Sequence, residues 1–165
     1  MKRRVEEHRA ADPQAVRAAA LALLGRREYA SAELTAALVR KGYAAAVARS
    51  VVTECAAERL LDDTRYAESL VRMLAGRGQG PARIRLALSE AGLTDEQIHA
   101  ALEGEQDWRA LAMEVRRRKF GAALPRAWPE RARQMRFLQY RGFCADDVAR
   151  VLGGTIQEED IPSAQ

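Results

Sequence analysis

The sequence predicts an all-α protein built from three tandem three-helix repeats of about 50 residues each. A glycine followed by a large apolar residue recurs every 50 residues, as Gly42-Tyr43, Gly92-Leu93 and Gly142-Phe143. A leucine stands four residues before each of these glycines. Apolar residues elsewhere follow helical spacing, and no stretch alternates with the period of a strand. Because a single short repeat buries little surface, we expect the repeats to pack into an elongated, curved bundle array.

The first helix of each repeat is predicted from apolar residues at helical spacing, beginning at Val16, Tyr66 and Trp108. Leucines also recur eighteen residues before the repeat glycines, at Leu24, Leu74 and Leu124. The last of them fits the frame less well, because the first helix of the third repeat is displaced and the stretch from Gly121 to Trp128 is expected to be a loop. Asp12 followed by Pro13 is typical of a helix start, because an acidic cap precedes a first-turn proline.

The second helices are predicted to end at the repeat glycines, which can take the left-handed conformation that closes a helix. Their expected spans are Ser31 to Lys41, Pro81 to Ala91 and Pro129 to Arg141. The third helices follow, and Thr94 with Gln97 forms a capping box at the start of one of them. Their expected spans are Ala45 to Arg59, Asp95 to Leu102 and Ala145 to Leu152.

These elements predict five segments along the chain. Residues 12–60, 61–104 and 105–153 are the three repeats, and residues 1–11 and 154–165 are expected to be disordered tails, the second of them acidic. The glycine-rich stretch from Gly76 to Gly80 lacks the Lys-Ser/Thr ending of a phosphate-binding loop and is interpreted as a flexible connection.

Signals for an enzyme, a metal site or a membrane segment are weak. The chain has 2 His and 2 Cys, without the spacing that a metal site or a nucleophile and its base would need. The apolar stretch from Ala18 to Leu24 is too short to cross a bilayer. We therefore expect a non-enzymatic cytoplasmic protein without a cofactor or a bound metal.

Positive charge gathers in the third repeat, where residues 105–153 contain 11 basic and 6 acidic side chains. Helical spacing places Arg133, Arg136 and Tyr140 in one stripe opposite the core, which suits phosphate contact beside a stacking platform. The alternative is a solvated helix face with cations near a helix C-terminus. The candidate basic patch for binding protein and DNA comprises Arg83, Arg116, Arg117, Arg118, Lys119, Arg133, Arg136, Tyr140 and Arg141.

Several motifs resemble the bacterial RecX family of regulatory proteins. The specific pieces are the stretch Leu60-Leu61-Asp62-Asp63-x-x-Tyr66-Ala67 and the ending Arg141-Gly142-Phe143, and the similarity extends from Pro13 to Leu152. Gln79 departs from the family pattern, which has a lysine before the glycine.

The resemblance implies a negative regulator of the RecA recombinase. Such a protein lies in the groove of the RecA–DNA filament and inhibits ATP hydrolysis, strand exchange and filament growth. The expected partners are RecA, single-stranded DNA and double-stranded DNA, and the protein is expected to act as a monomer. Two alternatives stay open: a free-standing regulator that binds DNA through helix-turn-helix-like units, and a repeat scaffold without nucleic-acid contact.

Overall fold

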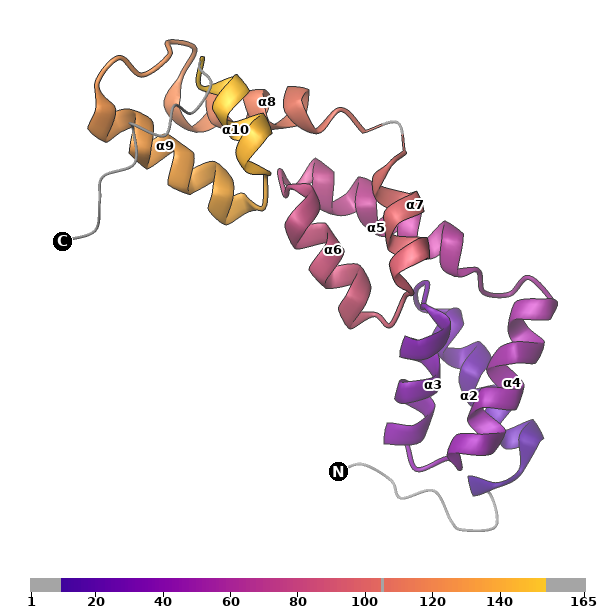
Figure 1. The fold of residues 1–165 in the computed structure, drawn as a ribbon. Helices are drawn as coiled ribbons and strands as arrows, with labels where there is room; N and C mark the ends of the chain where they lie inside the picture. Colours follow the sequence, from indigo (N-terminus) through magenta and orange to yellow (C-terminus); the bar gives the residue numbers. More distant parts are fainter. Residues whose placement is uncertain (1–9, 105, 154–165) are drawn as a thin grey trace. The chain divides into compact units, whose positions relative to one another are not determined.

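The computed structural model describes residues 10–104 and 106–153, and this part of the chain is helical without a strand (Figure 1). Its nine α-helices follow one another as three triplets, which confirms the predicted fold class. The tails predicted to be disordered lie outside the described residues, except for Ala10 and Ala11. The helices are α2 (Pro13–Leu24), α3 (Ser31–Arg40), α4 (Ala45–Ala57), α5 (Asp63–Gly76), α6 (Pro81–Glu90), α7 (Asp95–Leu102), α8 (Trp108–Phe120), α9 (Trp128–Arg141) and α10 (Ala145–Val151).

The chain forms two compact units that divide the second triplet between them. The first unit contains the described residues up to 70 together with 87–101, and the second contains 71–86 together with 102–153. Helix α5 passes from the first unit to the second, and α6 passes back. In the first unit α2, α3 and α4 enclose a core around Val16, Leu34 and Val51. In the second, α8, α9 and α10 enclose another around Ala112, Phe143 and Val148.

The repeat frame is visible in burial and in backbone conformation. Leu38, Leu88 and Leu138 are all fully buried, as expected for residues one repeat apart. Each contributes roughly 1.5–3 kcal/mol through removal of its side chain from water. The repeat glycines have φ angles of 98°, 85° and 93° at positions 42, 92 and 142. Leu124 lies in the loop between α8 and α9 and is 51% exposed, in agreement with the loop expected from Gly121 to Trp128.

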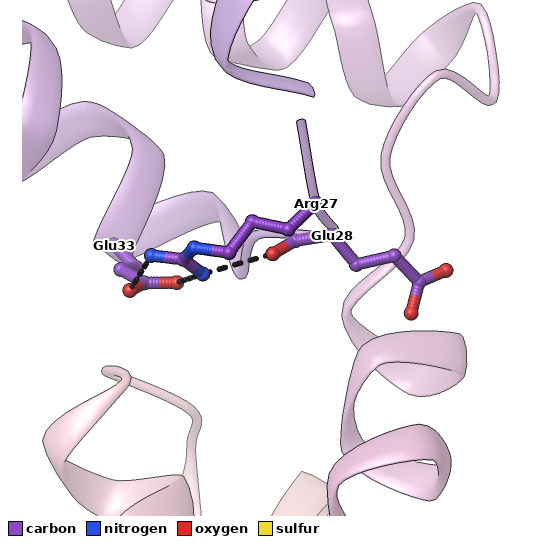
Figure 2. A network of polar contacts seen from close by, with 3 residues as sticks. All are labelled: Arg27, Glu28 and Glu33. Atoms are coloured by element: carbon purple, nitrogen blue, oxygen red, sulfur yellow. Dashed lines mark hydrogen bonds and ion pairs between the residues drawn. The ribbon is translucent and has the colours of Figure 1, made fainter. Parts of the chain in front are cut away.

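Polar contacts fix the loop between α2 and α3 in the first unit (Figure 2). The Arg27 guanidinium binds the Glu33 carboxylate through two hydrogen bonds of 2.9 and 2.6 Å and also donates to the backbone oxygen of Glu28. The Glu28 carboxylate points away from Arg27 and accepts from Arg65 Nε at 2.8 Å. The start of α3 receives a cap from the next repeat, since Asp63 Oδ1 accepts from the backbone N–H of Ser31 at 2.7 Å.

The start of α6 meets the end of α9 backbone to backbone in the second unit. The N–H of Gly80 donates to the carbonyl of Arg141 at 2.8 Å, and the N–H of Ala82 donates to the carbonyl of Gly142 at 3.0 Å. A Cβ atom on Gly80 would lie 2.5 Å from the Gly142 oxygen. The contact therefore needs glycine at position 80, where the sequence had predicted a flexible connection.

A related contact occurs 50 residues earlier in the first unit. A Cβ atom on Gly92 would lie 2.5 Å from the Cβ of Ala32, so the end of α6 lies against the first turn of α3.

Helix α9 departs from the repeat frame at its N-terminus. It begins at Trp128, three residues before the position that matches the start of α6, and the N–H of Arg131 already donates to the carbonyl of Ala127 at 3.1 Å.

Replacement of Gly80 by alanine should lower the midpoint of urea-induced unfolding. The added methyl group has no room beside Gly142, and overpacking of this kind costs about 1–3 kcal/mol. The matched control is Gly76→Ala at the end of α5, where nothing lies within 4 Å of the new Cβ. That change should raise the free energy of unfolding by roughly 0.5–1 kcal/mol. Equal midpoints for the two variants would contradict the close backbone contact.

Candidate nucleic-acid interface

The last turn of α8 carries exposed cations from the predicted patch. Arg117, Arg118 and Lys119 are exposed in the turn where positive charge is favoured by the helix dipole. Arg118 forms an ion pair with Glu114 one turn earlier, and both side chains are mostly exposed. Arg117 and Lys119 have no ion-pair or hydrogen-bond partner within residues 10–104 and 106–153. The two unpaired cations are therefore available to an external anion.

Arg116 does not belong to this exposed surface, although the sequence placed it there. Its side chain is only 2% exposed, because it lies on the core side of α8. The guanidinium donates to the carbonyls of Gly121, Ala122 and Ala123 at 3.0 Å each and to Gln134 Oε1 at 3.3 Å. Arg116 thus fastens the loop that follows α8, and a phosphate group outside the protein cannot reach it.

The exposed stripe predicted on α9 is present in the structure. Arg133, Arg136 and Tyr140 are exposed, whereas Leu138 is fully buried. Arg133 pairs with Glu130 at 3.5 Å and lies over the ring of Phe120, with 5.7 Å between guanidinium carbon and ring centroid. Arg136 has no hydrogen-bond or ion-pair partner among the described residues. Arg133 therefore connects the stripe to the end of α8.

Two phenylalanines, which the sequence pattern did not single out, support this stripe. The rings of Phe120 and Phe137 meet edge to face with centroids 5.2 Å apart. Arg141 lies over Phe137 at 5.4 Å and donates from Nη1 to the carbonyl of Arg77 at 3.2 Å. The available signal was the spacing of Arg133, Phe137 and Arg141, which places them along one row of the helix.

Arg83 and Tyr140 form a pair across the junction of α6 and α9. Arg83 Nε donates to the backbone carbonyl of Tyr140 at 2.8 Å, and its guanidinium carbon lies 4.4 Å from the centroid of the tyrosine ring. Tyr140 is nevertheless 71% exposed. Arg83 and Arg141 are thus partly committed to contacts inside the protein, unlike Arg117 and Arg136.

The cations that can meet a phosphate backbone lie on the last turn of α8 and the exposed stripe of α9. We use the name phosphate face for these five exposed cations as the candidate contact with a phosphate backbone: Arg117, Arg118, Lys119, Arg133 and Arg136. Guanidinium groups bind phosphate oxygens through paired, charge-assisted hydrogen bonds. Contacts of this kind give affinity that falls with salt and does not depend on base sequence.

The described residues offer no group of His, Cys, Asp and Glu side chains able to hold a metal ion. Burial raises the pKa of the Cys55 thiol. Burial and the hydrogen bond from its Sγ to Asp147 Oδ2, 3.0 Å long, raise the pKa of Cys144. Both shifts favour the protonated thiol over the nucleophilic thiolate. No helix in the described part of the chain is long and apolar enough to span a membrane.

Comparison with protein families gives three consecutive matches. The first, second and third three-helix domains of RecX match residues 17–55, 62–102 and 105–152. Among curated proteins, the regulatory protein RecX of Halorhodospira halophila is 45% identical over 148 residues, which cover 89% of this chain and 91% of that protein. The regulatory protein RecX of Pseudomonas putida (strain GB-1) is 42% identical over 143 residues, covering 86% and 92%.

Solved structures agree with this fold. A crystal structure of RecX from Lactobacillus salivarius superposes with a TM-score of 0.74 at 20% identity, covering 85% of this chain and 94% of that one. A second crystal structure of a regulatory protein RecX gives a TM-score of 0.71 at 21% identity, covering 87% and 72%. At these identities the likeness bears on the fold alone.

Arg116→Lys should lower the free energy of unfolding by about 3 kcal/mol, because an ammonium group cannot satisfy the carbonyls that the planar guanidinium reaches. The matched control is Arg117→Lys, whose exposed side chain should tolerate the change within roughly 0.5 kcal/mol. Urea unfolding followed by circular dichroism measures both. Similar stabilities would show that the buried hydrogen bonds of Arg116 contribute little.

Proposed function

The chain belongs to the RecX family, whose members are non-enzymatic regulatory proteins, and we propose that it is a negative regulator of the RecA recombinase. In this proposal it binds in the groove of the RecA–DNA filament and inhibits ATP hydrolysis, strand exchange and filament growth. The observation that carries the proposal is the match of all three domains, with 45% identity to a curated RecX across most of both chains.

The phosphate face supports a contact with the DNA of the filament. Arg117, Lys119 and Arg136 are exposed and have no partner among the residues that the structure describes. Such cations can replace counterions along the DNA backbone without losing a bond inside the protein. We propose that the protein acts in the bacterial cytoplasm as a monomer that contacts RecA together with single-stranded or double-stranded DNA.

A free-standing DNA-binding regulator is the second candidate. Helices joined by a tight turn at Gly42 or Gly142 resemble a helix-turn-helix unit in outline. A regulator of that kind discriminates its operator from other duplexes by at least roughly a thousandfold. Equal affinity for unrelated duplexes at one salt concentration would exclude it.

RecA-catalysed ATP hydrolysis on single-stranded DNA should fall when this protein is added well below the RecA concentration. One regulator bound to a filament affects many protomers if it blocks growth or promotes disassembly, whereas simple competition for DNA needs comparable amounts. Steady-state phosphate release measures the effect across a titration. Unchanged hydrolysis over the whole range would overturn the proposed function, even if the protein binds bare DNA.

The double variant Arg133→Glu/Arg136→Glu should bind a single-stranded oligonucleotide more weakly and with a smaller salt dependence. Each phosphate contact contributes about 0.7 to the slope of log K against log salt on single strands, so the slope should fall by roughly 1.4. The matched control is Arg40→Glu/Arg49→Glu, which makes the same change of net charge on exposed residues of the first unit. An equal loss of affinity in both double variants would show that the net charge of the protein, and not the position of Arg133 and Arg136, determines binding.

A further inference from the structure

The two most exposed large apolar side chains in the described part of the protein lie at one site. Tyr140 on α9 is 71% exposed and Leu86 on α6 is 60% exposed. Arg83 connects them, because it stacks on the Tyr140 ring at 4.4 Å and stands three residues before Leu86 on the same helix face. We call Leu86, Arg83 and Tyr140 the Tyr140–Leu86 patch.

The helices that carry the patch are fixed against each other by contacts inside the protein. The hydrogen bond from Arg83 to the Tyr140 carbonyl and the close approach of Gly80 to Gly142 fix α6 against α9 at this point. Arg83 covers one face of the tyrosine ring, and the exposure of the side chain leaves much of the rest open. Tyrosine and arginine are both enriched among the residues that contribute most of the binding energy of protein interfaces. Tyrosine contributes a large contact area at low cost in conformational entropy.

The chemistry of the patch differs from that of the phosphate face. Leu86 offers neither charge nor an aromatic ring, so it gains nothing from a phosphate group or a stacked base. It gains free energy when another apolar surface removes it from water. Arg83 supplies positive charge between Leu86 and Tyr140. A surface complementary to these three side chains would be an apolar depression flanked by carboxylates.

We propose that the Tyr140–Leu86 patch docks a protein surface of this kind, while the phosphate face contacts nucleic acid. The inference rests on the proposed function, since it assigns the protein component of the RecA–DNA filament to one face of the second unit. The guanidinium of Arg83 meets carboxylates of the partner, and Leu86 and Tyr140 enter its apolar depression.

The experiment distinguishes the Tyr140–Leu86 patch from the phosphate face by substitutions to glutamine, which carries no charge. Leu86→Gln and Tyr140→Gln keep the net charge, and Met113→Gln is the matched control because Met113 is an exposed apolar residue of the same unit, at 49%. Each variant is assayed for inhibition of RecA ATP hydrolysis on single-stranded DNA and for affinity to a fluorescent single-stranded oligonucleotide. We expect the half-inhibitory concentration to rise about tenfold for each patch variant, with oligonucleotide affinity within about twofold of the parent protein.

Two results would overturn the inference while leaving the proposed function intact. Weaker oligonucleotide binding by Tyr140→Gln and Leu86→Gln would assign the patch to nucleic acid. Inhibition equal to that of the parent protein and of Met113→Gln would show that the patch contacts no partner. If the parent protein itself leaves RecA hydrolysis unchanged, the proposed function fails, and the assignment of the patch to the filament fails with it. Leu86 is outside the α6–α9 backbone contact, and an oligonucleotide affinity equal to that of the parent protein shows that each variant is folded.

Discussion

The second unit depends on a contact between two helix ends, in which each end supplies the hydrogen-bond partners that the other lacks. The last carbonyls of a helix and the first N–H groups of another have no partners within their own helices. At the junction of α9 and α6, the carbonyls of Arg141 and Gly142 accept from the N–H groups of Gly80 and Ala82. Pro81 lies between these two donors and has no N–H to leave unpaired. The arrangement needs glycine on both sides, because a Cβ on Gly142 would lie 2.7 Å from the backbone nitrogen of Arg83.

This junction also sets the chemistry of the surface around it. Arg83 and Arg141 span the contact by donating to backbone carbonyls of the opposite segment, so neither has its full bonding capacity left for a ligand. The position of Arg83 is occupied by Glu33 one repeat earlier, where it binds Arg27 within the first unit. It is occupied by Arg133 one repeat later, where the side chain lies against Glu130 and Phe120. One position of the repeat therefore stabilises a loop in the first triplet, joins α6 to α9 in the second, and lies exposed beside Glu130 and Phe120 in the third.

Most of the fold could be predicted from the sequence, because the residues that determine where each helix begins and ends lie close together in the chain. Helical periodicity and the repeat glycines gave helix ends that agree with the structure within two residues, and the capping box of Thr94 and Gln97 is present as two hydrogen bonds. The candidate site was harder, since exposure depends on packing partners distant in sequence. Arg116 belongs to a run of four cations, and only the path of the loop at 121–123 makes it a buried donor. The role of Gly80 likewise arises from Gly142, which lies 62 residues away in sequence.

The early start of α9 limits how such an array can grow by gene duplication. A fourth triplet that repeated the α6–α9 junction would need to present its glycine-ended helix to free N–H groups at the position that corresponds to the start of α6. In α9 that position lies one turn inside the helix, where the N–H of Arg131 is already bonded to Ala127. A copy of the α6–α9 junction therefore cannot form at the start of α9 unless the first turn of that helix unwinds.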